Sequence, residues 1–338
     1  MKILLYFEGE KLIQTSGIGR AFKHQKSALE LAGVDYTTDP KDEYDILHIN
    51  TWGVTSQSMV AKARRDGKHV IFHAHSTEED FRNSFVLSNQ IAPIVKKILI
   101  SLYSSADHII TPTPYSKKLL EGYGIEIPIT DISNGIDLNR FDYDAEKVKA
   151  FRKYFSLQPT DKVVLSVGLY FERKGILDFM EVAKRLPEYK FIWFGYTPLL
   201  SIPKIVRDAI ADHPTNVILP GYVKGPIIEG AYANSDVFFF PTLEETEGIV
   251  VLEALAGKCQ AVIRDIGAFD PWMKDGVNCY KGNDIDEFVK LLKGCITYQL
   301  PSTIEEGYLT AKERSIPEVG QQLKHVYEQV MTLPIIEE

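Results

Sequence analysis

Short apolar runs alternate with helical segments through the first half of the sequence, and this alternation restricts the fold more than any other feature. Five runs are predicted as β-strands from their length and composition: 3–7, 45–49, 70–73, 108–111 and 129–133. Apolar residues at helical spacing begin near Ile18, Thr55, Ile91 and Tyr115. Such alternation is typical of the α/β class with a doubly wound parallel sheet. Ligands of these sheets bind at the carboxyl ends of the strands.

The same alternation starts again after a polar hinge, which predicts a second domain. The hinge is Ser133–Phe141, where Asn134 and Gly135 break the strand pattern. New strands are predicted to end at Val167 and to cover 191–195, 217–219 and 237–240. With 338 residues, 45% of them hydrophobic, the chain is long enough for two domains that each bury a core. We place these domains at residues 1–141 and 142–315.

An acidic turn follows the strand at 237–240. Residues 241–257 read PTLEETEGIVVLEALAG, with helical spacing after the first glycine. Glu244 and Glu247 stand near the helix start, where carboxylates often only cap a helix. Glu253 lies in an apolar run, where burial of a carboxylate is costly without partners, and sugar hydroxyl groups are suitable donors. If the helix reached back to Glu245, Glu245 and Glu253 would share one helix face.

A basic loop follows the strand that ends at Val167. Arg173 and Lys174 stand between this strand and a helix that is predicted from Gly175. The guanidinium fork, the lysine charge and the amide groups at a helix start together suit a diphosphate. An exposed basic turn is the alternative interpretation.

A glycine-containing segment, SGIGR at 16–20, follows the first strand and precedes a helix. Gly17 and Gly19 would let a ligand approach the backbone, and the amide groups of the helix start would favour an anion. The spacing is not GxGxxG, so a plain flexible loop fits the sequence as well.

Two patterns could suggest a metal site. His73 and His75 would point the same way from a strand, but no third ligand with suitable spacing accompanies them. Asp142 and Asp144 form a DxD pair without a preceding strand, so we interpret them as part of a solvated turn. We therefore expect no metal cofactor.

Three of these motifs, in their order along the chain, resemble those of the retaining glycosyltransferases of family four. They are the hinge Asn-Gly-Ile-Asp, the Arg-Lys-Gly loop, and Glu245 followed after seven residues by Glu253 and Ala-Leu-Ala-Gly. The resemblance implies the GT-B fold of two facing Rossmann-like domains, with the final segment 316–338 packed back on the first domain. It also implies a hexosyltransferase that uses a UDP-sugar and retains the α configuration. One departure is Leu169, where the family often has arginine after the strand glycine.

The resemblance implies a role for each motif residue. Glu253 would bind the ribose hydroxyl groups, Glu245 those of the donor sugar, and His75 the far edge of that sugar. Arg173 and Lys174 would stabilise the leaving diphosphate. The resemblance also assigns Gly17, Gly19, Tyr222, Gly248, Ile249 and Val250 to donor binding, and Glu79 and Asp80 to the acceptor side.

Several segments look most like those of bacterial enzymes that add a second hexose to monoglucosyl-diacylglycerol. The resemblance therefore implies UDP-glucose or UDP-galactose as the donor and a membrane glycolipid as the acceptor, and no residue decides between the two donors. A capsule or cell-wall polysaccharide transferase is an alternative. A non-catalytic GT-B partner subunit is another, although the retained Glu245, Glu253, Arg173 and Lys174 speak against it.

Charge and hydropathy favour contact with a membrane surface over contact with nucleic acid. The net charge is −8 and the pI is about 5.6, which argues against a general nucleic-acid binder. Phe85–Tyr103 contains many apolar residues, but its polar residues and Pro93 make it unsuitable for spanning a bilayer. The segment is therefore either interfacial or a core helix. Nearby cations would attract anionic lipid: Arg64, Arg65, Lys96 and Lys97. We expect a cytoplasmic protein, peripheral on the inner face of the cell membrane.

The three cysteines form no CxxC pair, which suits a reducing compartment.

Overall fold

A computed structural model describes residues 1–10, 16–270 and 272–335 of the chain. Contacts between residues divide it into two compact units. Unit 1 comprises Met1–Asp80, Ile91–Gly135 and Arg314–Glu338, and unit 2 comprises Phe81–Gln90 and Ile136–Glu313. The chain thus passes from unit 1 to unit 2 inside the predicted hinge, and a ten-residue stretch of the first half, Phe81–Gln90, belongs to unit 2.

Unit 1 is built on a parallel sheet of six strands in the order β2-β1-β3-β4-β5-β6. The strands are β1 (Lys2–Tyr6), β2 (Asp35–Thr37), β3 (Ile46–Ile49), β4 (His69–His73), β5 (His108–Thr111) and β6 (Ile129–Asp131). β3, β4 and β5 are buried along their whole length, because helices cover both faces of a parallel sheet. All five predicted strands form. β2 is a short edge strand with the sequence DYT, which carries no apolar run that could reveal it.

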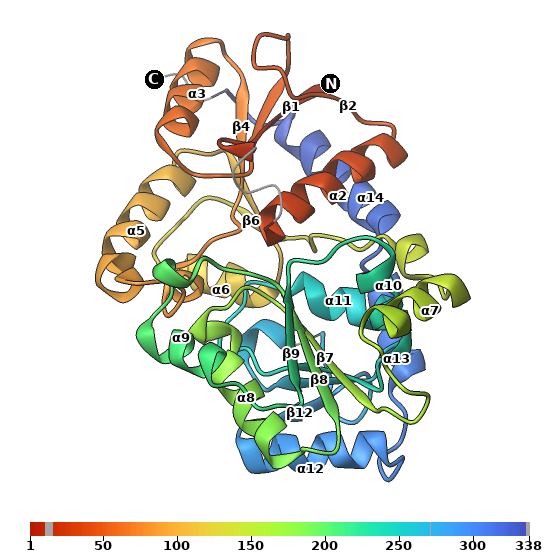
Figure 1. Ribbon diagram of the computed structural model, residues 1–338. Coiled ribbons are helices and arrows are strands. Elements are labelled where there is room, and N and C mark those ends of the chain that lie inside the picture. The colour runs from red at the N-terminus through yellow and green to blue at the C-terminus, as the bar shows by residue number, and fades with distance from the viewer. Residues whose placement is uncertain (11–15, 271, 336–338) are drawn as a thin grey trace. The chain divides into compact units, whose positions relative to one another are not determined.

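The helices that lie wholly or mainly in unit 1 are α2 (Gly17–Leu31), α3 (Val54–Arg65), α4 (Glu78–Phe81), α5 (Ser88–Tyr103), α6 (Pro114–Gly122) and α14 (Ile316–Val330). α14 lies along α2 (Figure 1). The two helices approach so closely that a Cβ atom on Gly320 would lie 2.3 Å from the carbonyl oxygen of Ala28. Of the segment predicted at 316–338, the helix covers Ile316–Val330, and residues 336–338 lie outside the described residues.

Unit 2 holds a second parallel sheet in the order β12-β11-β10-β7-β8-β9. Its strands are β7 (Val163–Val167), β8 (Lys190–Phe194), β9 (Val217–Gly221), β10 (Val237–Phe240), β11 (Ala261–Arg264) and β12 (Tyr280–Gly282). The α-helices are α7 (Ala145–Tyr154), α8 (Ile176–Arg185), α9 (Lys204–Ala211), α10 (Pro226–Asn234), α11 (Ile249–Ala256), α12 (Ile285–Ile296) and α13 (Ile304–Lys312). Short 3₁₀ helices are η1 (Leu138–Phe141), η2 (Glu172–Lys174), η3 (Leu199–Ser201) and η4 (Gly267–Phe269).

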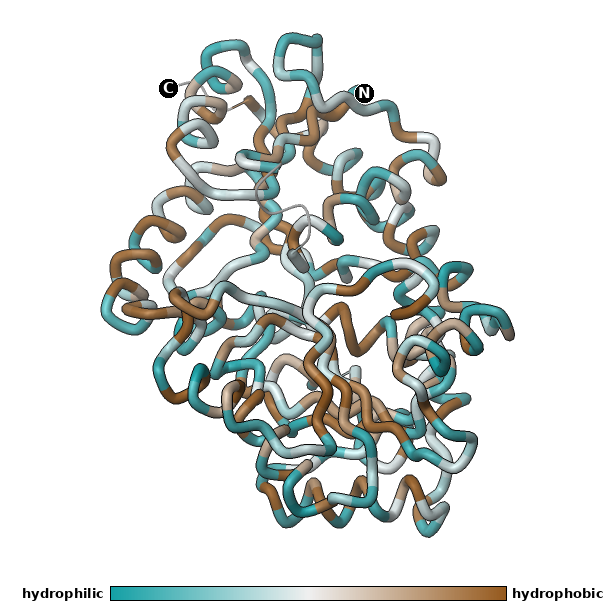
Figure 2. The backbone as a smooth tube through the Cα atoms, in the orientation of Figure 1, coloured by the Kyte–Doolittle hydropathy of each residue, from teal (hydrophilic) through white to brown (hydrophobic). Residues whose placement is uncertain are grey.

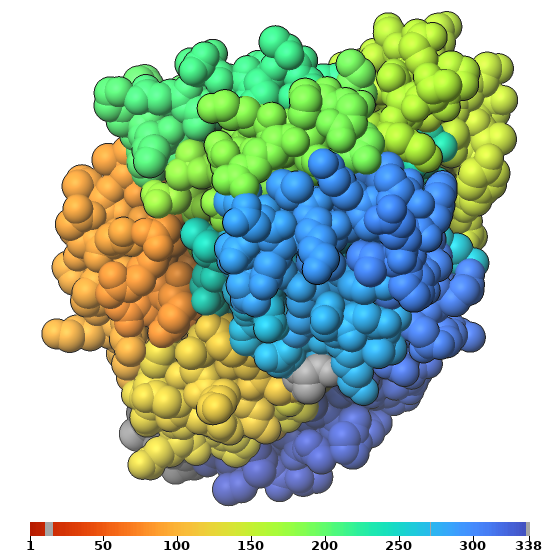
Figure 3. Space-filling model, turned by 90° about the horizontal axis from the view of Figure 1, so that it is seen from below, coloured from red at the N-terminus to blue at the C-terminus, as the bar shows by residue number. Residues whose placement is uncertain are grey.

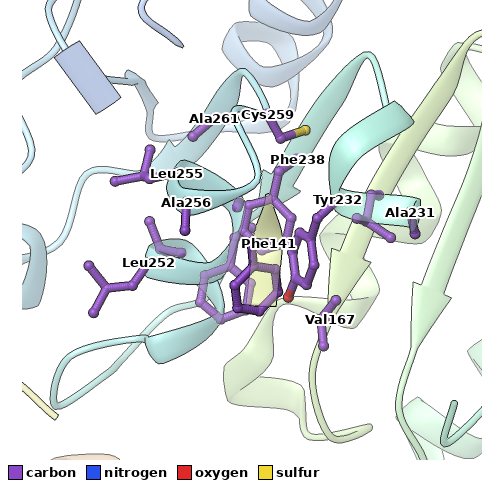
Figure 4. Packing of buried hydrophobic residues seen from close by; sticks show 14 of the residues in the cluster. Phe141, Val167, Ala231, Tyr232, Phe238, Leu252, Leu255, Ala256, Cys259 and Ala261 are labelled. Carbon is purple, nitrogen blue, oxygen red and sulfur yellow. The ribbon is translucent and has the colours of Figure 1, made fainter. Parts of the chain in front are cut away.

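The central strand β10 sends alternate side chains into two hydrophobic layers. Phe238 and Phe240 enter one layer, and Val237 and Phe239 enter the other. The first layer includes Phe141, Tyr232 and Phe238, which lie together in Figure 4. The central strands β7 and β8 of this sheet are largely brown, hence hydrophobic, in Figure 2. The face of the molecule seen in Figure 3 carries α12, in blue. Both units therefore have the predicted α/β class with doubly wound parallel sheets.

Candidate functional site

The basic loop of unit 2 follows β7 and is fixed by one glycine. Gly175 ends η2 with φ at +76°, a backbone conformation that favours glycine. A Cβ atom on Gly175 would lie 2.1 Å from the carbonyl oxygen of Pro241, so any larger residue would force this loop away from the acidic turn after β10. The sequence therefore brings the basic loop and the acidic turn together at the carboxyl edge of the sheet.

Lys174 and Glu245 form a buried ion pair at this edge. The Lys174 Nζ atom lies 2.5 Å from Glu245 Oε1, and the Thr242 hydroxyl donates to the same oxygen at 2.9 Å. The Lys174 and Glu245 side chains are only 15% and 6% exposed. A charge pair so little hydrated exerts a strong local field, so an anion or a hydroxyl group placed beside it would interact strongly with one partner.

Arg173 is held by three groups of unit 2. Its backbone N–H donates to the carbonyl oxygen of Asn83, Nε donates to Ser84 Oγ, and Nη1 donates to the carbonyl oxygen of Glu244, at 2.9, 2.9 and 3.0 Å. The residue is 7% exposed. These contacts fix the loop that carries Lys174, and they direct two of the guanidinium nitrogens to protein oxygens.

The acidic turn ends where α11 begins. Gly248 precedes the helix with φ at +84°, and a Cβ atom there would lie 3.1 Å from the Phe269 ring. The N-cap residue of this helix, Gly248, has no side chain that could cap the first amide groups. Glu245 lies before the helix, so it does not share a helix face with Glu253; the conditional geometry considered from the sequence does not occur. Glu245 instead reaches the edge of the sheet from the loop.

Glu253 is 1% exposed and lies inside α11. Its Oε2 accepts a hydrogen bond from the hydroxyl group of Tyr232 on α10, at 2.7 Å. This phenol supplies a partner that a buried carboxylate requires. Sequence reasoning missed Tyr232, because a single tyrosine in a helical segment carries no signal of what it contacts. Tyr222, also predicted for the donor, follows β9 and is 53% exposed.

Unit 1 contains a pocket of about 220 Å³ at the carboxyl ends of its strands. The residues around it are Glu8, Ile18, Asn50, Thr51, Trp52, Phe72, His73, His75, Ser76 and Tyr103. Asn50 Nδ2 and His73 Nε2 are buried without a hydrogen-bond partner among the described residues. Buried polar atoms are normally paired, so these two orphaned atoms suit a polar ligand in the pocket. Of these residues, the sequence singled out only the two histidines.

Three histidines of unit 1, His48, His73 and His75, form a buried column. The His73 ring stacks on His75 with centroids 4.1 Å apart, and His48 stacks on His73 at 5.4 Å. His48 Nδ1 is 2.7 Å from the Tyr327 hydroxyl of α14, and His75 Nε2 is 3.2 Å from Asn50 Oδ1. Burial lowers the pKa of His48 and of His75 to about 3, and it lowers the pKa of His73 well below its ordinary value. The column is therefore neutral at pH 7.

Glu8 occupies the start of α3 with its carboxylate. The backbone N–H and the hydroxyl group of Ser56 donate to Oε2 at 2.8 and 2.7 Å, and the backbone N–H of Thr55 donates to Oε1 at 3.3 Å. Partial burial raises the pKa of Glu8, but these hydrogen bonds outweigh it, so the pKa is lowered overall. The pocket thus has one charged wall and one neutral wall.

The structure places the remaining predicted residues of unit 1 outside this pocket. The Gly19 amide donates to Ser16 Oγ at 3.2 Å, so one amide of the α2 start is used in capping, and Gly17 begins the helix. Glu79 accepts a hydrogen bond from the Tyr123 hydroxyl group. The backbone N–H of Asp80 donates to Thr77 Oγ1. Within the described residues no group of three or more histidine, cysteine, aspartate or glutamate side chains could hold a metal ion.

Two of the cations expected to attract lipid have other roles. Arg64 is buried and donates twice to Asp107 at 2.8 Å, so it is a structural ion pair and the prediction of a surface charge is wrong. Lys96 lies 3.1 Å from Glu78 and 4.1 Å from the centre of the Tyr123 ring. Arg65 and Lys97 are exposed. Among the described helices, none is long and apolar enough to cross a membrane.

α5 combines the two alternatives that the sequence left open. Ala92, Val95 and Leu99 are buried, as in a core helix. Ile91 and Ile94 are 37% and 61% exposed, as in an interfacial segment.

Two units with parallel α/β sheets, the second with a basic loop, an acidic turn and a helix start at its strand ends, have the architecture of the GT-B class of glycosyltransferase. Solved GT-B structures have the same fold: Anabaena HepE in complex with UDP-glucose superimposes with a TM-score of 0.72, at 16% identity, over 97% of this chain and 100% of that one. The family described as Glycosyltransferase Family 4 matches residues 35–140, and the one described as Glycosyl transferases group 1 matches residues 161–297.

Curated relatives place the chain more narrowly. The processive diacylglycerol alpha-glucosyltransferase of Acholeplasma laidlawii is 46% identical over 334 residues, which are 98% of this chain and 99% of the relative. The alpha-galactosylglucosyldiacylglycerol synthase of Streptococcus pneumoniae is 24% identical over 277 residues, which are 80% of this chain and 74% of that protein. The chain belongs to the glycosyltransferases of family four, as the motifs indicated.

Proposed function

We propose that the protein transfers glucose from UDP-glucose to a diacylglycerol-based acceptor and retains the α configuration. The observation that carries this proposal is the 46% identity with a diacylglycerol alpha-glucosyltransferase over almost the full length of both chains. That relative is named as processive. We therefore infer that both diacylglycerol and its monoglucosyl product serve as acceptors here.

The donor is proposed to bind at the carboxyl edge of the unit 2 sheet. Lys174 would leave Glu245 and turn its ammonium group to the departing diphosphate, while the amide groups at the start of α11 donate to phosphate oxygens. Glu245, released from this contact, would accept hydrogen bonds from the donor sugar. Glu253 would bind the ribose hydroxyl groups, with Tyr232 holding its carboxylate in place.

Arg173 has a different proposed role from that of Lys174. Its Nε and Nη1 atoms donate to Ser84 and Glu244, so it supports the loop geometry, and its charge adds to the field at the diphosphate. Leu169, at the position where the family often has arginine, is 37% exposed. We infer that the phosphate grip depends mainly on Lys174 and on helix amides.

The acceptor is proposed to place its hydroxyl groups in the unit 1 pocket. Asn50 Nδ2 and His73 Nε2 offer unpaired polar atoms, and Trp52 offers an apolar ring surface beside them. The neutral histidine column can exchange hydrogen bonds with hydroxyl groups without attracting an anion. His75, on the wall of the pocket, is proposed to contact the sugar that is transferred.

The proposed transfer needs no catalytic carboxylate as nucleophile. The acceptor hydroxyl group would attack from the face that the diphosphate leaves, and the departing phosphate would accept its proton. The residues of unit 2 then act by stabilising the charge that develops on the diphosphate.

The test is a matrix of donors and acceptors with the purified protein. UDP-glucose and UDP-galactose are each offered with diacylglycerol, α-monoglucosyl-diacylglycerol and a soluble oligosaccharide. We expect transfer from UDP-glucose to both lipids, α-linked products by NMR, and unchanged rates in EDTA. Transfer only to the oligosaccharide would favour a polysaccharide transferase, and a requirement for Mg²⁺ or Mn²⁺ would contradict the metal-free mechanism.

The choice of donor has one competing candidate. The streptococcal relative is named as an alpha-galactosylglucosyldiacylglycerol synthase, so UDP-galactose is the second donor to consider. Its identity of 24% is lower than the 46% of the glucosyltransferase, which favours glucose. A kcat/KM for UDP-galactose above that for UDP-glucose would reverse this choice.

A further inference from the structure

Unit 2 carries two exposed apolar loops that lie against each other. The first is residues 84–87, and the second is residues 199–205; we call them the paired loops. The backbone N–H of Val86 donates to the carbonyl oxygen of Ser201 at 3.0 Å, which joins them. Their exposed side chains are Val86, Leu87, Leu199, Leu200 and Ile205, at 45%, 61%, 46%, 90% and 56%.

The first of the paired loops is held rigidly. Leu87 has φ at +68° and Asn83 has φ at +53°, values that side chains other than glycine rarely adopt. Asn83 and Asn89 exchange two hydrogen bonds, at 2.9 and 2.7 Å, and the rings of Phe81 and Phe85 pack edge to face. The segment therefore keeps Leu87 exposed to water, although both its backbone conformation and the exposure of its apolar side chain are unfavourable. Such an arrangement indicates a functional contact.

The sequence around the paired loops contains cations but no acids. No aspartate or glutamate occurs in residues 81–106 or 189–207, although the whole chain carries a net charge of −8. The second loop leads into Lys204 and Arg207; Lys204 pairs with Asp208 across one turn of α9, and Arg207 donates to the carbonyl oxygen of Ile202. Apolar side chains flanked along the sequence by cations complement an anionic lipid surface.

The first loop also reaches the donor side of the site. The carbonyl oxygen of Asn83 accepts from the Arg173 backbone, and Ser84 Oγ accepts from Arg173 Nε. Arg173 in turn accepts from Leu243 N and Thr242 Oγ1 at its carbonyl oxygen, at 2.7 and 3.1 Å. Arg173 is therefore the only residue between these contacts and Lys174 in the sequence.

We propose that the paired loops are a membrane-contact element of the donor-binding unit, and that docking on an anionic bilayer sets the position of the Arg173–Lys174 loop. Leu87, Leu199 and Leu200 enter the boundary between headgroups and acyl chains, and Ser84 transmits the contact to Arg173. This inference rests on the proposed function, because a diacylglycerol acceptor stays in the bilayer. It assigns the lipid contact to unit 2, in addition to the exposed face of α5.

The docking part is tested by vesicle co-sedimentation without donor or acceptor. The variant L199S/L200S should bind phosphatidylglycerol vesicles at least about tenfold more weakly than the wild type, since two apolar side chains no longer enter the interface. The matched control is V277S/L309S, which removes two apolar residues of unit 2 that are 47% and 49% exposed. Wild-type binding by L199S/L200S, or equal wild-type binding to phosphatidylcholine vesicles, would overturn the proposed surface.

The coupling part uses Ser84→Ala and its conservative partner Ser84→Thr. Ser84→Ala should bind vesicles normally but lose about tenfold in kcat on vesicle-borne acceptor, with little change in the KM for the donor, because a hydrogen bond to the guanidinium is lost. Ser84→Thr should restore kcat. Unchanged kcat in Ser84→Ala would overturn the coupling. If the wild type glucosylates no diacylglycerol lipid even in detergent micelles, the proposed function fails, while co-sedimentation still decides whether the paired loops bind membranes.

Discussion

The two units share one architecture but present opposite electrostatic environments at their strand ends. Unit 2 places a buried ion pair there, Lys174 with Glu245, next to the guanidinium of Arg173. Unit 1 places a column of neutral histidines there, with orphaned polar atoms on Asn50 and His73. A diphosphate needs fixed charge, whereas hydroxyl groups need hydrogen-bond partners that do not compete for an anion. On the proposed function, the corresponding edges of the two sheets would therefore bind different ligands because their side chains differ in charge.

Removing the charge of unit 2 should have the largest effect. Lys174→Ala should lower turnover by at least about 100-fold, because it removes the group that is proposed to stabilise the leaving diphosphate. The measurement is steady-state transfer from UDP-glucose. Lys162→Ala is the matched control, since Lys162 also pairs with a carboxylate, Asp236 at 2.8 Å, but at the opposite end of β7. Near wild-type turnover in Lys174→Ala would remove Lys174 from the site.

Removing a hydrogen bond of unit 2 while keeping its charges should have a smaller effect. Tyr232→Phe leaves Glu253 without the phenol, which costs about 1.5 to 3 kcal/mol for a hydrogen bond to a charged group. If Glu253 binds the ribose, part of this loss should appear as a higher KM for UDP-glucose with kcat little changed. Tyr280→Phe, which removes a phenol hydrogen bond to the carbonyl oxygen of Pro301, is the control. Equal KM values in both variants would contradict the role of Glu253.

The neutral column of unit 1 should appear as a dependence of stability on pH. His48 and His75 have a pKa of about 3 when folded and about 6.5 when unfolded, so the unfolded chain binds more protons below pH 6.5. Their contribution is complete above pH 6.5 and is lost as the pH falls towards 3, by up to about 2 kcal/mol for each histidine at pH 5. Urea unfolding between pH 7 and pH 5 measures this slope.

Two histidine variants distinguish the effect of the buried column from that of other titrating groups. His48→Gln should reduce the slope, whereas His325→Gln, at an exposed position of α14, should leave it unchanged. An identical slope in His48→Gln and the wild type would show that the column is not kept neutral by burial.

The repeating alternation of strands and helices predicted the fold well, because a parallel sheet needs apolar strands that are buried on both faces. The strands β11 and β12 were not predicted. β12 is three residues long, YKG, and β11 is a four-residue strand that begins soon after α11 ends at Ala256, so neither has a distinct pattern. Short strands of this kind form because a neighbouring strand offers them hydrogen bonds, which is information that lies elsewhere in the chain.

The candidate site shows the same limit at the level of side chains. Glu245, Glu253 and Lys174 stand in motifs with a recognisable order, and the structure brings Lys174 and Glu245 together. Tyr232 and Ser84 come from distant segments and touch the site through one hydroxyl group each. A single hydroxyl group leaves no periodicity or spacing in a sequence, so only the folded chain reveals such partners.

Because α14 packs on unit 1, it determines which fragments of the chain could fold on their own. Tyr327 completes the histidine column, and Gly320 brings α14 against Ala28, so the first unit is built from segments on both sides of the second unit in the sequence. A fragment that stops at the hinge would lack part of its own interior and should not be expressed as a folded domain. Unit 2, by contrast, is almost one insertion, from Ile136 to Glu313. A ribosome therefore releases α14 of the first unit only after the whole second unit has been made, so the first unit is the one that completes its interior last.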